Sequence, residues 1–141
     1  MQFTILLTDD SSPMRKVLKK TFKAAGYAES EFLEAADGKQ GLEKLRNHRV
    51  DIVITDYTMP EMDGLEMIRA IKNDPALKHI PVVAVTTEGS SEIINRFMEQ
   101  GAEGYIKKPF TPEQLRDLLV KILGVSDYDQ DTDASDSDFD F

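Results

Sequence analysis

The stretch from residue 3 to residue 25, FTILLTDDSSPMRKVLKKTFKAA, contains one complete strand–loop–helix unit. Its first five residues are apolar except for Thr4, and such an almost unbroken apolar run is typical of a strand that is covered on both faces. Two aspartates, Asp9 and Asp10, follow closely. Ser12 is then predicted to cap a helix that has Pro13 at its first position. The helix is expected because mostly apolar side chains recur on one face at helical spacing: Met14, Val17, Leu18, Thr21, Phe22 and Ala25.

The same unit recurs four more times along the chain. Further apolar runs lie around Phe32–Leu33 and at Ile52–Ile54, Pro81–Val85 and Gly104–Lys107. Segments with helical periodicity separate them, and most begin with a side chain that can cap a helix: Asp37, Asp63, Ser90 or Ser91, and Thr111. The strand starts are roughly 20–30 residues apart, which suits crossover connections between parallel strands. The pattern predicts an α/β fold of the (βα)5 type, a doubly wound five-stranded parallel sheet with helices on both faces.

The net charge of −9 is unevenly distributed along the chain. Residues 126–141, SDYDQDTDASDSDFDF, contain seven of the 26 acidic residues and no basic residue, which leaves 19 acidic against 17 basic residues elsewhere. We therefore expect one globular domain over residues 1–125 and an acidic Asp-rich tail over residues 126–141. The tail has too few apolar residues to offset the entropy of ordering, so we expect it to be disordered. Neither part has the excess of basic residues that is typical of proteins that bind duplex nucleic acid.

The composition excludes several other classes of protein. The 141 residues include no cysteine, so disulfides, thiolate nucleophiles and cysteine-ligated zinc are absent. The N-terminal residues lack the basic start of a signal peptide, and no run approaches the ~18 apolar residues of a membrane helix. We expect a cytoplasmic protein that has neither nucleic acid nor a membrane among its partners.

Polar side chains stand at four of the five predicted strand ends, where ligands of an open parallel sheet bind. Carboxylates that lie close together repel one another unless a cation neutralises them. Oxygen ligands without His or Cys are typical of Mg²⁺. A lysine and a hydroxyl can donate to phosphoryl oxygens, and a carboxylate that faces a phosphoryl group can act as a nucleophile. The pattern favours phosphoryl transfer to an aspartate at the following set of residues: Asp9, Asp10, Asp56, Thr86, Thr87, Lys107 and Lys108.

These residues and their surroundings resemble response-regulator receiver domains, in particular the stand-alone receivers that act in chemotaxis. The matching motifs are TDDSSPMRKVL, TDYTMPEMDG, VTTEGS and GAEGYIKKPFT, and the resemblance covers about residues 3–124. It implies a flavodoxin-like fold for the globular domain. It also implies Mg²⁺ as the cofactor.

The resemblance implies a role for each matched residue of the site. Asp56 corresponds to the phosphoacceptor. Asp9 and Asp10 correspond to the acidic pair that holds Mg²⁺, together with Asp56 and the backbone carbonyl of Thr58. Lys108 corresponds to the lysine that binds the phosphoryl group.

Further roles concern switching and the lifetime of the acyl phosphate. Thr86 corresponds to the switch hydroxyl, and Tyr105 to the aromatic side chain that rotates on activation. Thr58 and Glu88 occupy the positions that modulate the access of hydrolytic water. The Lys108–Pro109 peptide bond is expected to be cis.

Two pairs of adjacent residues, Lys107 with Lys108 and Thr86 with Thr87, each offer two candidates for one role in the site. Strand alternation sends Lys107 and Lys108 to opposite faces. Tyr105 shares its face with Lys107, so we assign the site lysine to Lys108 and expect Lys107 to be solvated. The spacing from the acceptor that the family shows selects Thr86 over Thr87.

The leading hypothesis is a stand-alone response regulator of a two-component system, a signalling switch that catalyses only its own phosphorylation and slow dephosphorylation. A sensor histidine kinase would donate the phosphoryl group. The face formed by Ser90–Glu99, Gly104–Lys107 and Thr111–Leu123 would then bind a target protein, such as a component of the flagellar motor switch, because no output domain is expected after residue 124. A phosphatase is a further expected partner. The alternative is a phosphate sink or a phosphorelay intermediate outside chemotaxis.

Three other functions fit the residues less well. A phosphatase of the haloacid dehalogenase type needs a second acid two residues after the nucleophile, where this chain has Thr58. A flavodoxin-like cofactor binder needs a loop rich in hydroxyls and glycine after the first strand, where this chain has DDSSP. A scaffold that is not phosphorylated would not need the complete set of site residues.

The acidic tail has a predicted binding surface of its own. Its aspartates are interleaved with Tyr128, Phe139 and Phe141, a composition that can dock on a basic and apolar surface. The sequence-based candidate is the predicted target-binding face, whose basic residues are Arg96, Lys107, Arg116 and Lys121. We expect the tail to compete weakly there with the partner, and less so at high salt.

Overall fold

The computed structural model describes the chain except for residues 1, 58, 60, 88–89 and 125–141. Five parallel strands form one sheet in the order β2–β1–β3–β4–β5. The strands are β1 (Thr4–Thr8), β2 (Glu31–Ala35), β3 (Ile52–Thr55), β4 (Val82–Thr86) and β5 (Gly104–Lys107). Each strand contains most or all of the apolar run from which it was predicted. The prediction of a five-stranded parallel sheet is therefore confirmed.

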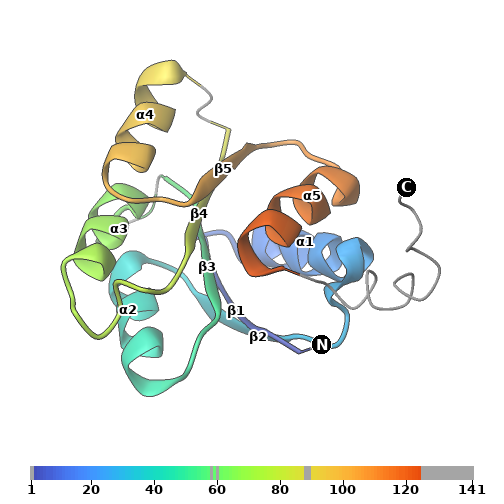
Figure 1. Cartoon of the computed structure of the whole chain (residues 1–141), viewed down its shortest axis with the longest axis horizontal. Coiled ribbons are helices and arrows are strands. Elements are labelled where there is room, and N and C mark those ends of the chain that lie inside the picture. Colours follow the sequence, from blue (N-terminus) through green and yellow to red (C-terminus); the bar gives the residue numbers. More distant parts are fainter. Residues whose placement is uncertain (1, 58, 60, 88–89, 125–141) are drawn as a thin grey trace.

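Helices cover both faces of this sheet (Figure 1). One face is covered by α1 (Ser12–Phe22), its continuation η1 (Lys23–Tyr27) and α5 (Pro112–Leu123). The other is covered by α2 (Gly38–Asn47), α3 (Gly64–Lys72) and α4 (Ser91–Glu99). The doubly wound arrangement is thus also confirmed. Among the described residues, every helix is too short or too polar to cross a bilayer.

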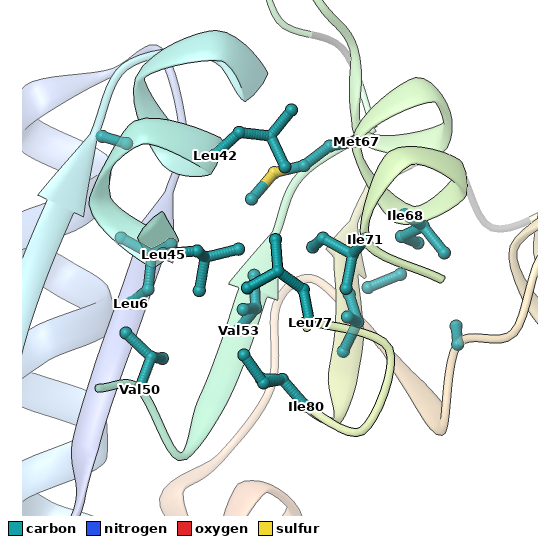
Figure 2. Close-up of a cluster of buried hydrophobic side chains, with 14 of the residues drawn as sticks. Leu6, Leu42, Leu45, Val50, Val53, Met67, Ile68, Ile71, Leu77 and Ile80 are labelled. Atoms are coloured by element: carbon teal, nitrogen blue, oxygen red, sulfur yellow. The ribbon is translucent and has the colours of Figure 1, made fainter. Parts of the chain in front are cut away.

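Alternate side chains of the strands build two separate hydrophobic layers. On β1, Ile5 and Leu7 belong to the layer under α1 and α5, whereas Leu6 belongs to the layer under α2 and α3. Figure 2 shows the second layer, where side chains such as Leu42 of α2 and Met67 of α3 converge above the sheet. Because both faces of the sheet are covered, the central strands β1, β3 and β4 are buried at nearly every position.

Side-chain caps begin four helices as predicted. In each, the cap accepts a hydrogen bond from the backbone N–H three residues later: Asp37, Asp63, Ser90 and Thr111. The predicted cap of α1 is wrong, because Ser11 and not Ser12 accepts the N–H of Met14, at 3.1 Å. The N–H of Ser11 donates to Oδ1 of Asp9 at 2.9 Å, so the loop after β1 is short and α1 begins one residue earlier than expected.

The end of α1 has a feature that helical periodicity does not reveal. The five residues of η1 form a π-helical turn in which Gly26 has a φ of +109°, a conformation that glycine adopts without strain. The turn brings Tyr27 into the core, where its ring packs against Phe22 and Phe3 at centroid distances of 6.3 Å and 5.9 Å.

Candidate functional site

Two aspartates meet where neighbouring strands end. Asp9 follows β1 and Asp56 follows β3, and the register pairs Thr8 with Thr55 just before them. The N–H of Asp56 donates to the carbonyl of Thr8 at 3.1 Å, which fixes the two strand ends relative to each other. Carboxylate oxygens of Asp9, Asp10 and Asp56 all lie within 4.8 Å of one another. The predicted convergence of these three carboxylates is therefore confirmed.

The carboxylates of this acidic cluster differ in their surroundings. The side chain of Asp9 is 3% exposed and that of Asp56 is 18% exposed, whereas Asp10 is exposed. One oxygen of each enclosed carboxylate accepts a backbone N–H: Ser11 donates to Asp9 at 2.9 Å, and Tyr57 donates to Asp56 at 2.8 Å. These bonds fix the orientation of both carboxylates, so their second oxygens point to a common neighbour.

That neighbour is the ammonium group of Lys108. Its Nζ lies 3.3 Å from Oδ2 of Asp9 and 3.6 Å from Oδ2 of Asp56, and the side chain is only 12% exposed. The N–H of Lys108 donates to the carbonyl of Thr86 at 3.0 Å, which ties the end of β5 to the end of β4. A single positive charge is thus held against the two enclosed carboxylates.

The two neighbouring lysines lie in different environments. On β5, Tyr105 and Lys107 are exposed, whereas Ile106 is buried between them. Lys107 therefore points away from the acidic cluster while Lys108 enters it, as strand alternation predicted. The Lys108–Pro109 peptide bond is cis, as the resemblance implied.

The charge balance of the cluster favours a bound cation. Burial raises the pKa of Asp56 above its ordinary value, because the charged form loses hydration. The ammonium group of Lys108 and the N–H of Tyr57 oppose this shift, and the nearby charge of Asp9 adds to it. Three carboxylates against one lysine leave excess negative charge. The oxygen donors fit Mg²⁺, which binds few carboxylates and keeps several waters.

The other predicted site residues lie around the cluster or outside the described residues. Thr86 is the buried last residue of β4, whereas Thr87 is exposed. The side chain of Tyr105 is 44% exposed. Thr58 and Glu88 lie outside the described residues, so the carbonyl ligand and the two positions that affect lifetime stay predictions.

Arg15 is a supporting residue that the sequence did not reveal. Its Nη1 donates to the backbone carbonyl of Asp9, and its Nε donates to Oε1 of Glu34 at 2.8 Å. Lys19 donates to the other oxygen of Glu34 at 2.8 Å. Hydrogen bonds from Lys19 and Arg15 hold the pKa of Glu34 below its ordinary value, so this carboxylate is charged at neutral pH. The resulting network connects β2 and α1 to the backbone of the acidic cluster.

Gly64 allows α3 to begin directly against the acceptor. Its N–H donates to the carbonyl of Tyr57 at 2.9 Å. A Cβ at this position would overlap the carbonyl oxygen of Asp56. The close approach of α3 to the acceptor loop therefore requires a residue without a side chain at this position.

Comparison with known proteins assigns the chain to a family. The profile of the response regulator receiver domain matches residues 5–120. The chain therefore belongs to the response regulator receiver domain family. Within that family, it is similar to chemotaxis proteins of the CheY type.

The similarity to these relatives extends over most of both chains. The chain is 40% identical over 124 residues to chemotaxis protein CheY1 of Helicobacter pylori, which covers 87% of this chain and 98% of that protein. It is 37% identical over 119 residues to chemotaxis protein CheY of Pseudomonas aeruginosa, which covers 84% and 94% respectively.

Two solved structures have the same fold at recognisable sequence identity. Chemotaxis protein CheY4 of Vibrio cholerae is 36% identical with a TM-score of 0.77, covering 87% of this chain and 100% of that chain. A CheX–CheY–BeF3–Mg²⁺ complex from Borrelia burgdorferi contains a chain that is 28% identical with a TM-score of 0.78, covering 87% and 90%.

Proposed function

We propose that this protein is a stand-alone response regulator that accepts a phosphoryl group on Asp56. The observation that carries the proposal is the position of this carboxylate. Its Oδ2 lies 3.6 Å from Nζ of Lys108, and its oxygens belong to the same 4.8 Å cluster as those of Asp9 and Asp10. In phosphoryl transfer to a carboxylate, the carboxylate is the nucleophile, and positive charges beside it stabilise the phosphoryl oxygens. Here those charges would be a metal ion held by the acidic cluster and the ammonium group of Lys108. Residues 1–125 would act as the receiver, and residues 126–141 would form an acidic tail.

In the proposed reaction, the carboxylate of Asp56 attacks the phosphorus atom of a phosphohistidine on a sensor histidine kinase. The P–O bond forms as the P–N bond breaks, and the electron pair of that bond returns to the imidazole. The ammonium group of Lys108 would stabilise the charge on the phosphoryl oxygens. Asp9, Asp10 and Asp56 would hold Mg²⁺ together with the carbonyl of Thr58, and the bound ion supplies further neutralisation of those oxygens.

The acyl phosphate would then act as a switch rather than as an intermediate of a separate enzymatic reaction. Thr86 would move toward the phosphoryl group, and Tyr105 would turn inward from its exposed position. The face formed by α4, β5 and α5 would bind a target protein in the cytoplasm. Thr58 and Glu88 would set the rate at which water hydrolyses the acyl phosphate.

The similarity to chemotaxis proteins supports a target in the flagellar motor switch. The Borrelia complex supports binding of a second protein by a CheY-like chain. A phosphatase, which would hydrolyse the acyl phosphate, is a further candidate partner here. A phosphate sink or phosphorelay role would instead require that the phosphorylated protein bind no motor component. A pull-down with the phosphorylated and the unphosphorylated protein as bait separates these two functions. Capture of a motor component only by the phosphorylated protein would favour the first function.

The experiment that tests the acceptor is the substitution Asp56→Asn. The purified variant, incubated with Mg²⁺ and a small phosphodonor such as acetyl phosphate, should show no mass increase corresponding to a phosphoryl group. Asp63→Asn is the matched control, because asparagine also caps helices and Asp63 caps α3. It should be labelled like the unchanged protein. Full labelling of Asp56→Asn would contradict the assignment.

A further inference from the structure

One side of α1 and the first residue of η1 carry a row of lysines that the proposed function does not use. Lys16, Lys19, Lys20 and Lys23, here called the lysine stripe, line a shallow surface pocket. Lys19 is paired with Glu34 at 2.8 Å. The other three lysines are exposed, and no carboxylate among the described residues forms an ion pair with them. Like charges three and four residues apart on a helix repel one another, so the stripe favours an acidic ligand.

An apolar groove of about 340 Å³ lies along another side of α1, and Val17 and Lys20 are the neighbouring residues of the two surfaces. Its walls include Met14, Val17 and Thr21 of α1 and the segment Pro109–Phe110 after β5. The side chain of Val17 is 53% exposed, the largest exposure of any large hydrophobic residue that the structure describes. Lys20 follows Val17 by three positions and is therefore its neighbour on the helix surface. A ligand that binds both surfaces must combine acidic and apolar side chains.

The sequence of this chain after α5 has that composition. Residues 126–141 contain seven aspartates and no basic residue, and they end with Asp138-Phe139-Asp140-Phe141. In an extended segment, successive side chains point to opposite sides. These four residues could therefore present aspartates to the lysine stripe and phenylalanines to the apolar groove at the same time.

The length of the chain also permits this contact. α5 ends at Leu123 and packs beside α1 and η1 on the same face of the sheet (Figure 1). The 17 residues from 125 to 141 span up to ~56 Å when extended. The whole of α1 is only ~17 Å long, so the tail can reach any part of the lysine stripe and the groove.

We propose that residues 126–141 dock within the same molecule along α1, with aspartates on the lysine stripe and the terminal phenylalanines in the apolar groove. The α4–β5–α5 face, which the sequence alone favoured, is less suited. There Arg96 is paired with Glu92 at 3.0 Å, and Arg116 lies 3.8 Å from Asp117. α1 has no acidic residue to compete with the tail. The docking does not require phosphorylation of Asp56, so it can fail or succeed independently of the proposed function.

Lys108 and Pro109 also line the apolar groove, which connects the docking surface to the acidic cluster. The proposal therefore concerns a contact of the chain with itself, in addition to its proposed role as a switch.

Carbodiimide cross-linking of the full chain tests the docking directly, because it joins lysine ammonium groups to carboxylates in contact. Mass spectrometry should find Asp138 and Asp140 joined to Lys16, Lys20 or Lys23 in the monomer. The yield should fall at least about fivefold when the ionic strength rises from 0.01 M to 1 M, because salt screens exposed charges.

Matched variants separate the lysine stripe from general attraction to basic surfaces. The double variant Lys16→Gln/Lys20→Gln should reduce the yield of cross-links to Lys23 several-fold. The control Lys39→Gln/Lys78→Gln removes the same charge from exposed positions on α2 and after α3, and it should leave that yield unchanged. The methyl NMR signals of Met14 and Val17 should also shift when Phe139 and Phe141 are both replaced by serine.

Three outcomes would overturn the proposal. Cross-links from Asp138 and Asp140 could be concentrated on Lys107, as the sequence-based alternative requires, or be spread evenly over all lysines. They could form only in cross-linked dimers, which would indicate a contact between two copies. The control variant could lower the yield as much as the double variant does.

Discussion

Replacing Gly64 with alanine should damage both the fold and the acceptor, because α3 and the loop after β3 meet at this residue. A Cβ at Gly64 would overlap the carbonyl oxygen of Asp56. It would also lie 3.0 Å from the carbonyl carbon of Asp56 and 3.2 Å from Cα of Tyr57. All three atoms belong to the backbone, so no change of rotamer can make room.

The clash can be relieved only if α3 or the acceptor loop moves. Overpacking typically costs ~1–3 kcal/mol, and a backbone clash puts Gly64→Ala at the upper end of that range. For a domain of this size, ~3 kcal/mol corresponds to a fall in Tm of roughly 10 °C. A displacement on the order of 1 Å at a reacting group can lower a rate about 100-fold, so phosphorylation of Asp56 should slow by a similar factor.

Gly104→Ala is the control, since the added Cβ would meet only the ends of two side chains, Leu118 at 3.0 Å and Ile122 at 3.6 Å. Those side chains can turn aside, so the Tm should fall by no more than about 4 °C, the equivalent of ~1 kcal/mol. Thermal denaturation followed by circular dichroism measures the Tm, and mass spectrometry measures the rate of phosphorylation by a small phosphodonor. A Gly64→Ala variant with the Tm and rate of the unchanged protein would refute the steric argument, as would equal damage in Gly104→Ala.

Three further predictions concern charges around the acidic cluster. Glu34→Gln should lower the free energy of unfolding by roughly 0.5–1 kcal/mol at pH 7. The basic partners of Glu34 hold its pKa below the ordinary value of 4.5. The difference in stability between the two proteins should therefore be complete above pH 4.5 and disappear as the pH falls through the lower pKa of the folded state. Urea denaturation at several pH values measures this difference. Mg²⁺ at about 100 times its Kd should stabilise the protein by ~2.7 kcal/mol. Asp10→Ala should lose most of this gain in thermal denaturation, whereas Asp37→Ala should lose ~1 kcal/mol of helix capping and keep the gain. Lys108→Ala should keep the stabilisation by Mg²⁺ but fail to bind the partner after phosphorylation, whereas Lys107→Ala should be close to the unchanged protein; equal defects in a binding assay would contradict the strand-alternation argument.

The sheet and the acidic cluster could be predicted because the signals for them are local. The runs FTILL, IVI and PVVAV are almost continuously apolar and do not alternate with polar residues, which is typical of strands covered on both faces. Polar residues follow directly after these runs: Thr8 and Asp9 follow the first, and Thr55 and Asp56 follow the second. Parallel pairing brings these ends to one edge, so the convergence of the carboxylates follows from topology alone.

The supporting contacts could not be predicted because they depend on how elements pack. The sequence identifies Arg15 on α1 and Glu34 on β2, but the position of the helix over the sheet decides which basic residue reaches the carbonyl of Asp9. Ser11 and Ser12 are equally good caps in isolation, and the hydrogen bond of Ser11 to Asp9 decides between them. Gly64 illustrates the intermediate case, in which a glycine indicates a close approach but not the atom that is approached.

α1 connects the parts of the molecule that the proposed function and the proposed docking use. Its inner face is held in the core by Leu18 and Phe22, which are almost completely buried. Because an α-helix is rigid over this length, the same packing orients Arg15 toward the backbone of Asp9 and the lysine stripe toward solvent. The side chains that support the acidic cluster therefore do not belong to the exposed part of the stripe that would receive the tail. A ligand bound to Lys16, Lys20 and Lys23 therefore does not compete for Arg15, the side chain that holds the backbone of Asp9.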